Sequence, residues 1–361
     1  MPSIPQRYRA IMRPAAAAME PYDPQAADVR INLSANENTH GLAPSLRLAV
    51  DRALAKVATN RYPDPLAGDL RAAIAQVEGV DPAWVIVGNG GDELIFNLFL
   101  AFCDDGSRVL TCPPTFAVYG IYAELVGAQV VEVPRDPKTF EVRAREVVEA
   151  AASARVVCLT SPNNPTGTLV DPALVREVCA ACPGIVLADE AYMEFAPAGS
   201  SARPLLNDCD NLVILHTFSK AYCLAGARVG YVLANPGIIS ALAAVRQPYS
   251  VSSLDQAAAL AVMGRRDAMA PVITSIVDQR ELVREELAKL PGATVWPSAA
   301  NFLFVRLPHA HEVWERLRDE HSILVRDFSA NPACPDCLRI TVGTPGENAA
   351  VIKALSQLVK E

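Results

Sequence analysis

The strongest constraint on the fold is a regular alternation of short β-branched runs with helical patterns between about residues 84 and 234. Such alternation predicts βαβ units and a mainly parallel α/β sheet. Several runs are apolar at every position, as expected for strands that helices cover on both faces. Strands are expected at 84–88, 108–112, 128–134, 154–160, 184–190, 211–217 and 228–234, and helices at 91–102, 116–127 and 171–182.

The pattern changes after Pro236-Gly237, where a long helical stretch precedes shorter strand-like runs, a helix over 311–321 and a terminal helix. This region predicts a smaller α+β domain, and 361 residues are enough for about two domains. The expected division is an N-terminal arm over 1–30, a large α/β domain over 46–235, and a small domain formed by 31–45 together with 236–361.

The composition argues against several classes of protein. The net charge of −8 disfavours binding to nucleic acid or anionic lipid, since both require a basic face. No run approaches about 18 apolar residues, so no membrane-spanning helix is expected, and the proline-broken N-terminus does not resemble a signal peptide. Nine cysteines, an odd number, fit reduced thiols in a cytoplasmic protein.

Two cysteine pairs, Cys179/Cys182 and Cys334/Cys337, have the Cys-x-x-Cys spacing of a zinc site. Cys179 and Cys182 end an apolar helical run, and neither pair has the turn glycines or nearby histidine of a zinc knuckle. Thiols without a metal are therefore the favoured interpretation, and no metal is expected.

Four polar motifs, at 88–92, 161–167, 188–192 and 217–220, fall at the ends of expected strands. Each alone has an ordinary explanation, such as a glycine turn, an Asn-Pro turn, a helix-capping Asp or a solvated Lys. Ligands of open α/β sheets bind beyond these strand ends. Pyridoxal phosphate needs a lysine for an imine and a carboxylate beside its pyridine nitrogen, which Lys220 and Asp189 supply.

The phosphate of this cofactor also needs donors. The chain offers a predicted helix start, two hydroxyls and an arginine, namely Gly90, Gly91, Asp92, Thr217, Ser219 and Arg228. The N–H groups and the dipole at a helix start favour an anion, and the arginine fork suits a phosphate. The glycines fit neither a P-loop nor the Gly-x-Gly-x-x-Gly motif of dinucleotide sites.

Several longer motifs carry a resemblance to a known family. Ser-Pro-Asn-Asn-Pro-Thr-Gly (161–167), Asp-Glu-Ala-Tyr (189–192), Ser-Lys-Ala (219–221) and Gly-Ala-Arg-Val-Gly (226–230) resemble the fold-type I, class I/II aminotransferases. The likeness runs from about Leu33 to the C-terminus and includes LSANEN, NRYPDP, CPPTF and CLRITVGTPGEN. NRYPDP and LRITVGT favour the histidinol-phosphate aminotransferase family. The resemblance implies pyridoxal phosphate, a homodimer, and a large domain with a mainly parallel seven-stranded sheet beside a smaller α+β domain.

The resemblance also implies roles for single residues. Lys220 would form the imine and shuttle the proton, Asp189 would pair with the pyridine nitrogen, and Phe116 would stack on the ring where many relatives have Tyr. Tyr192 and Asn164 would bond the phenolic oxygen of the ring. The phosphate would be held by Gly91, Asp92, Thr217, Ser219 and Arg228, with Tyr62 contributed by the other subunit. Ala227 replaces the Leu usual in the Gly-Leu-Arg-x-Gly motif.

Arginines mark the expected substrate end. Arg339 lies in an apolar strand pattern, where an arginine is costly unless it is paired, so a site role is favoured. Arg326 has Asp327 as a possible structural partner. The resemblance places Arg339 at the anionic end of the substrate, with Arg326, Asn36 and Tyr22 nearby. That anion is either a phosphate or a carboxylate.

The resemblance implies an enzyme that transfers an amino group from L-histidinol phosphate to 2-oxoglutarate by a ping-pong mechanism, in histidine biosynthesis. An aromatic amino acid aminotransferase and a threonine-phosphate decarboxylase remain alternatives on the same scaffold. A cofactor-binding module without turnover is the alternative from another class of protein. The complete set of Lys220, Asp189, Tyr192 and Asn164 disfavours it.

Overall fold

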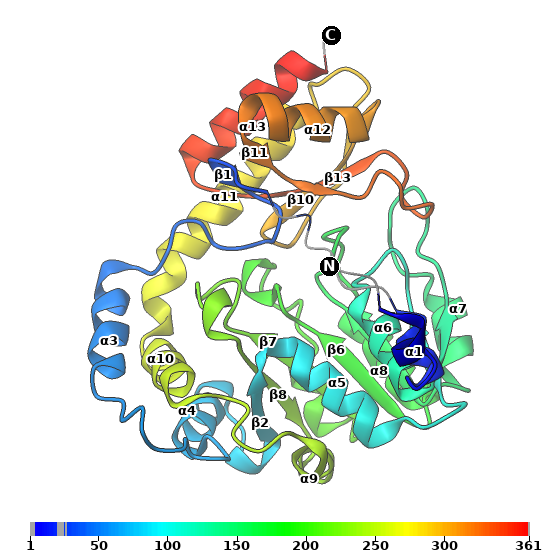
Figure 1. Ribbon diagram of the computed structural model, residues 1–361, viewed down its shortest axis with the longest axis vertical. Helices are drawn as coiled ribbons and strands as arrows, with labels where there is room; N and C mark the ends of the chain where they lie inside the picture. The colour runs from blue at the N-terminus through cyan, green and yellow to red at the C-terminus, as the bar shows by residue number, and fades with distance from the viewer. Residues whose placement is uncertain (1–3, 20–24, 26, 360–361) are drawn as a thin grey trace.

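The computed structural model describes residues 4–19, 25 and 27–359, and Figure 1 shows a large lower unit beneath a smaller upper unit. The large unit contains a seven-stranded sheet of order β2-β8-β7-β6-β5-β3-β4. Within this sheet only β8 runs antiparallel to its neighbours, so the predicted mainly parallel α/β fold is confirmed. The strands are β2 (Val85–Asn89), β3 (Arg108–Thr111), β4 (Gln129–Glu132), β5 (Val156–Thr160), β6 (Ile185–Asp189), β7 (Leu212–Thr217) and β8 (Val229–Ala234).

Helices cover both faces of the large sheet. Alternate side chains along a strand point to opposite faces, so an apolar strand contributes to the core on each side. On β5, Val157 and Leu159 pack towards one layer of helices, whereas Val156 and Cys158 pack towards the other. The first layer contains α3 (Pro44–Leu54), α4 (Gly68–Glu78), α7 (Ala144–Ala151), α8 (Pro172–Ala181) and α10 (Ser253–Met263). The second contains α5 (Gly90–Phe102), α6 (Val118–Val126) and α9 (Pro236–Val245).

The small unit combines two sheets with helices. Strands β12-β13-β10-β9 form an antiparallel sheet, and β1 pairs parallel with β11. On β13, Leu338 and Ile340 pack into the small core, so Arg339 and Thr341 lie on the opposite side of the sheet. The elements are β1 (Ile31–Asn32), α11 (Ala270–Leu287), β9 (Thr294–Val295), β10 (Phe302–Arg306), α12 (Ala310–His321), β11 (Ile323–Leu324), β12 (Arg326–Asp327), β13 (Cys337–Thr341) and α13 (Pro345–Leu358).

Short polar residues fix where several helices begin. The side chains of Asp171, Asn235 and Ser252 accept hydrogen bonds from backbone N–H groups in the first turns of α8, α9 and α10. Proline follows directly at the first position of α8 and α9, where its missing N–H costs nothing. Short 3-10 helices occur at η1 (Pro82–Trp84), η2 (Met193–Phe195), η3 (Arg203–Asn207), η4 (Ala225–Ala227) and η5 (Arg266–Met269).

The packing of α9 to α11 bears on the division into domains. Ile239 of α9 and Ala259 of α10 are buried against the large sheet, although both follow Pro236. Helix α11 passes from one unit to the other, since Ile276 lies in the large core and Leu287 in the small core. The division at 236 stays a prediction, and on this packing we propose that the boundary lies within α11.

Two short helices, α1 (Gln6–Arg9) and α2 (Pro14–Ala17), form the described part of the predicted N-terminal arm. Helix α2 contacts α6 at the side of the large unit. Among the described residues, no helix combines the length and the apolar character needed to cross a lipid bilayer.

Candidate active site

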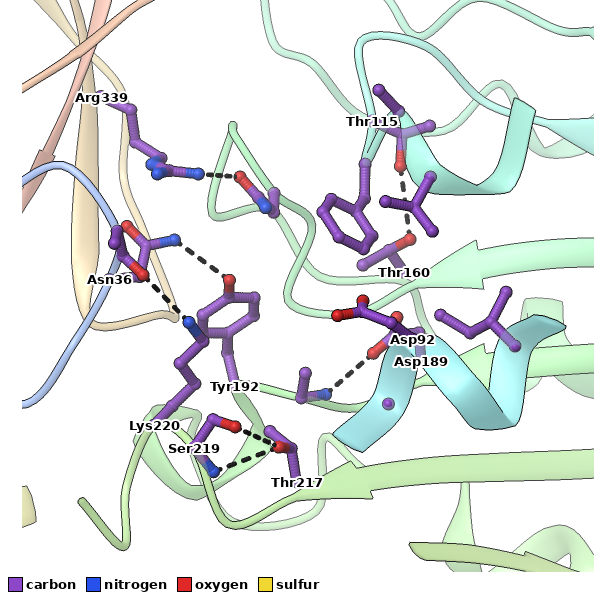
Figure 2. Close-up of a pocket in the computed structure, with 18 of the residues that line it drawn as sticks. Asn36, Asp92, Thr115, Thr160, Asp189, Tyr192, Thr217, Ser219, Lys220 and Arg339 are labelled. Carbon is purple, nitrogen blue, oxygen red and sulfur yellow. Dashed lines mark hydrogen bonds between the residues drawn. The ribbon is translucent and has the colours of Figure 1, made fainter. Parts of the chain in front are cut away.

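A cavity of about 330 Å³ lies where the C-terminal ends of β5, β6 and β7 face the small unit. This is the edge at which open α/β sheets bind ligands. Asp189, Lys220 and Tyr192 lie around the same space in Figure 2. Of the residues predicted for the site, the cavity brings together Asn36, Gly91, Asp92, Phe116, Asn164, Asp189, Tyr192, Thr217, Ser219, Lys220, Arg228, Arg326 and Arg339.

Asp189 ends β6 at the base of the cavity and is 4% exposed. Its Oδ2 accepts a hydrogen bond from the Tyr119 hydroxyl at 2.5 Å, and its Oδ1 accepts one from the Ala191 N–H at 3.1 Å. Burial raises the pKa of the Asp189 carboxyl, and the hydrogen bond from Tyr119 acts in the opposite direction. No cation within the described chain forms an ion pair with this carboxylate, so the site suits a ligand that brings a positive charge.

Lys220 follows β7 and points towards the small unit (Figure 2). Its Nζ donates a hydrogen bond to the backbone carbonyl of Ala35 at 3.0 Å and lies 5.9 Å from the centre of the Tyr192 ring. Burial, followed by the positive charge of Arg339, lowers the pKa of Lys220 to about 8. The uncharged form, which a nucleophile or a base requires, is therefore much more abundant near neutral pH than in an ordinary lysine.

The start of α5 and the turn after β7 form an end of the cavity that is rich in donors. Gly91 and Asp92 lie in the first turn of α5, where backbone N–H groups have no acceptor within the helix. The Thr217 Oγ1 accepts a hydrogen bond from the Ser219 N–H at 3.1 Å, and the two hydroxyl oxygens lie 3.0 Å apart. Arg228 Nη2 lies 3.0 Å from Asp92 Oδ2. The backbone N–H groups, the two hydroxyls and the Arg228 guanidinium suit an anion such as a phosphate.

The opposite end of the cavity is formed with residues of the small unit. Arg339 donates to Asn164 Oδ1 at 2.5 Å and to the backbone carbonyl of Ser34. Its guanidinium carbon lies 5.5 and 5.8 Å from the centres of the Phe302 and Phe328 rings. The two aromatic rings and the two hydrogen bonds hold the guanidinium in place.

Asn36 and Tyr192 join the two units beside Lys220. Asn36 Nδ2 donates a hydrogen bond to the Tyr192 hydroxyl at 3.0 Å, and Asn36 Oδ1 accepts one from the hydroxyl of Thr341 in β13. Burial raises the pKa of the Tyr192 hydroxyl, while the charge of Arg339 lowers it. Tyr192 therefore keeps its proton at neutral pH and has it available to donate to a ligand.

A sequence profile of the family described as aminotransferase class I and II matches residues 28–355. This range includes every residue that lines the cavity. The chain belongs to the class I and II aminotransferases.

Individual relatives agree with this assignment. A histidinol-phosphate aminotransferase of Roseiflexus castenholzii is 38% identical, over 98% of this chain and 100% of that protein. The crystal structure of histidinol-phosphate aminotransferase from Sinorhizobium meliloti, in complex with pyridoxal 5′-phosphate, has a TM-score of 0.89 at 28% identity, covering 97% of this chain and 98% of that one. L-threonine-O-3-phosphate decarboxylase from Porphyromonas gingivalis has a TM-score of 0.81 at 27% identity, covering 92% and 100%.

These comparisons confirm the predicted family, enzyme class and cofactor. The chemistry of this aminotransferase's cavity also fits pyridoxal phosphate. A buried carboxylate that has no ion pair in the described part of the chain, an amine with a lowered pKa and an anion-binding end occur together in one cavity. Those are the groups that a protonated pyridine, an aldehyde and a phosphate require.

Among the described residues, two that were predicted for the site, Gly90 and Tyr62, do not line the cavity. Tyr62 is 84% exposed and stacks on Tyr249, with ring centres 4.8 Å apart. Tyr22 lies outside the described residues.

The sequence reasoning missed Tyr119, which bonds Asp189, together with Thr115 and Thr160 of the cavity wall. A signal for Tyr119 did exist, because a tyrosine within the apolar helical run 116–127 needs a partner for its hydroxyl once it is buried.

Proposed function

We propose that this aminotransferase transfers the amino group of L-histidinol phosphate to 2-oxoglutarate, giving imidazole acetol phosphate and glutamate. The observation that carries the proposal is one cavity holding Lys220 and Asp189 at its base and two arginines, Arg326 and Arg339, at its substrate end. The near full-length likeness to histidinol-phosphate aminotransferases supports this choice of donor. The two substrates would enter the same cavity in turn.

The cofactor would be held by residues from several strand ends. Asp189 would face the pyridine nitrogen, Phe116 the ring face, and Tyr192 with Asn164 the phenolic oxygen. When bound, pyridoxal phosphate supplies an electron-withdrawing ring that stabilises the negative charge left on the substrate carbon after its proton is removed. The phosphate would be held by Gly91, Asp92, Thr217, Ser219 and Arg228.

Lys220 would move the proton of the substrate carbon. Burial and the charge of Arg339 lower the pKa of this amine to about 8, so it can accept a proton and return it within one catalytic cycle. The Ala35 carbonyl, 3.0 Å from Nζ, orients the amine. Asp189 would pair with the positively charged pyridine nitrogen at the base of the cavity, where the low dielectric strengthens the attraction.

The substrate anion would bind at the small-unit end. Arg339 presents a planar fork of donors that suits both phosphate and carboxylate oxygens, which fits an enzyme that takes one substrate of each kind. Arg326 and Asn36 line the same end. Tyr22 is proposed to join them on the basis of the family resemblance.

The donor is tested with a panel of amines at saturating 2-oxoglutarate, with glutamate formation as the readout. Histidinol phosphate is expected to exceed phenylalanine, tyrosine and histidine in kcat/KM. Faster conversion of phenylalanine or tyrosine would make the chain an aromatic aminotransferase. Threonine phosphate enters the same panel because of the likeness to the decarboxylase, and release of CO₂ from it would replace the proposal with that activity.

We also propose a homodimer in which Tyr62 reaches the cofactor phosphate of the other subunit. An exposed aromatic pair, Tyr62 on Tyr249, supports a covered surface at this position. Mixing dissociated Tyr62→Ala and Lys220→Ala subunits tests it, because only a contribution across subunits rebuilds one complete site in the hybrid. Recovery of activity on mixing is expected, and no recovery would place Tyr62 outside the partner's site.

A cytoplasmic location is proposed on the state of the cysteines. All nine are free thiols in the structure, and thiols remain reduced in that compartment.

A further inference from the structure

Tyr119 is a fully buried tyrosine of α6 that lies outside the lining of the cavity. Its hydroxyl lies 2.5 Å from Asp189 Oδ2 and 2.9 Å from the Thr160 hydroxyl. A phenol carries one hydrogen, and an ionised carboxylate only accepts. The Tyr119 hydrogen therefore goes to Asp189, and the Tyr119 oxygen accepts the hydrogen of Thr160. The three groups form one directed chain that ends on the carboxylate.

The ring of Tyr119 supports a second wall of the cavity. Phe116 precedes it by three residues, and the two rings meet edge to face with centres 5.7 Å apart and planes at 87°. Phe116 lines the cavity, whereas Tyr119 lies behind it. One side chain therefore contacts both the carboxylate at the base and the ring proposed to stack on the cofactor.

We propose that Tyr119 is a positioning residue for the reaction: its hydroxyl, oriented by Thr160, keeps the Asp189 carboxylate ionised and aimed at the pyridine nitrogen of the cofactor. This inference rests on the proposed binding of pyridoxal phosphate by Asp189.

The energetics support a role beyond packing. Burial of Asp189 disfavours its charge, and a hydrogen bond donated to a carboxylate in such surroundings is among the stronger ones in proteins. Burial and the Asp189 charge raise the pKa of Tyr119 well above its usual value, so the hydroxyl keeps its proton and remains a donor. Without this donor, the proton between the carboxylate and the pyridine nitrogen shifts towards the carboxylate, and the ring loses positive charge.

A matched tyrosine exists on β8 of the large sheet. Tyr231 of β8 is 4% exposed and donates to Glu78 Oε1 at 2.8 Å, so Tyr231→Phe removes a buried hydroxyl from a carboxylate just as Tyr119→Phe does. Tyr231 does not line the cavity. A purely structural role for Tyr119 predicts that the two variants behave alike.

The experiment uses the enzyme reconstituted with pyridoxal phosphate labelled with ¹⁵N at the pyridine nitrogen, whose resonance reports protonation directly. In the wild type and in Tyr231→Phe, we expect a protonated ring nitrogen across neutral pH. In Tyr119→Phe, we expect the resonance to move towards the unprotonated value and kcat to fall about tenfold with little change in KM, as for the loss of one hydrogen bond to a charged group. Thr160→Val should shift the resonance in the same direction by a smaller amount.

A Tyr119→Phe or Thr160→Val enzyme whose resonance follows the wild-type pH curve overturns the inference while leaving the proposed function standing. Thr160→Val keeps the test decisive if Tyr119→Phe does not fold. A wild-type protein that takes up no labelled cofactor overturns the proposed function and this inference together.

Discussion

Strand β8 passes so close to the start of α5 that Gly230 has no room for a side chain. A Cβ at Gly230 would lie 2.9 Å from the Gly91 nitrogen, 3.0 Å from the Gly90 carbonyl carbon and 3.1 Å from the His216 carbonyl oxygen. All three are backbone atoms, so no side-chain rotation relieves the contact. Because carbon contacts are normally about 3.5–4.0 Å, Gly230→Ala must push the start of α5 away by about 0.5 Å.

That displacement acts on a proposed phosphate donor, the N–H of Gly91. Overpacking of this kind costs about 1–3 kcal/mol. If this cost is about 1.4 kcal/mol larger in the cofactor-bound enzyme than in the cofactor-free enzyme, the affinity for pyridoxal phosphate drops about tenfold. Titration of the cofactor-free enzyme with pyridoxal phosphate, followed by visible absorbance, measures the loss of affinity. Thermal unfolding of the cofactor-free enzyme measures the loss of stability that is independent of the cofactor.

Gly346→Ala provides the control, because a Cβ at Gly346, in the first turn of α13, would have no neighbouring atom within 4 Å. Alanine in a helix is favoured over glycine by up to about 1 kcal/mol, so this variant should bind cofactor normally and unfold no earlier. Wild-type cofactor affinity in Gly230→Ala would refute the reasoning that the β8 backbone fixes the position of the phosphate donors.

Three further outcomes follow from the site. Lys220→Ala should lose the absorption band of the imine with the cofactor and lower turnover by at least about 1000-fold, while the unfolding temperature of the cofactor-free protein stays near wild type. Transamination at the wild-type rate would contradict the assignment of Lys220. The rate of cofactor uptake should rise with pH and level off above the Lys220 pKa of about 8, since only the uncharged amine attacks; a midpoint near 10 would contradict the lowered pKa. Arg135 is 3% exposed and donates hydrogen bonds to the Cys112 and Phe140 carbonyls and the Thr168 hydroxyl. Arg135→Met leaves these acceptors without that donor, so it should lower the free energy of unfolding, measured in denaturant, by about 2–4 kcal/mol. The exposed Arg145→Met should cost less than about 0.5 kcal/mol, and equal losses in the two variants would count against the Arg135 network.

The sequence was most informative where a local pattern has one physical meaning. Apolar runs such as 154–160 predicted central strands because only a sheet covered on both faces buries every position, and the motifs at their ends predicted most of the cavity. Tyr119 was missed because a tyrosine in an apolar helical run is normal core composition, and its partner Asp189 is 70 residues away in sequence.

The boundary at Pro236 illustrates a different limit. Pro-Gly predicts a break between domains, and that prediction stands beside a second one: Asn235 caps α9 and Pro236 is its first residue, so the same residues also mark the start of a helix. Whether α9 packs on the large or the small unit depends on tertiary contacts that no local pattern encodes. Tyr62 is a further case, because the role expected for it requires a second chain.

The segment around Ala35 gives the small unit direct control over the reactive amine. Leu33 is hydrogen-bonded to β11 and β13, and two residues later the Ala35 carbonyl accepts from Lys220. Any separation of the two units would remove that acceptor and admit water, which restores the preference of the amine for its charged form. The contact between the two units therefore helps to keep the Lys220 amine uncharged, the form that reacts with the aldehyde of the cofactor.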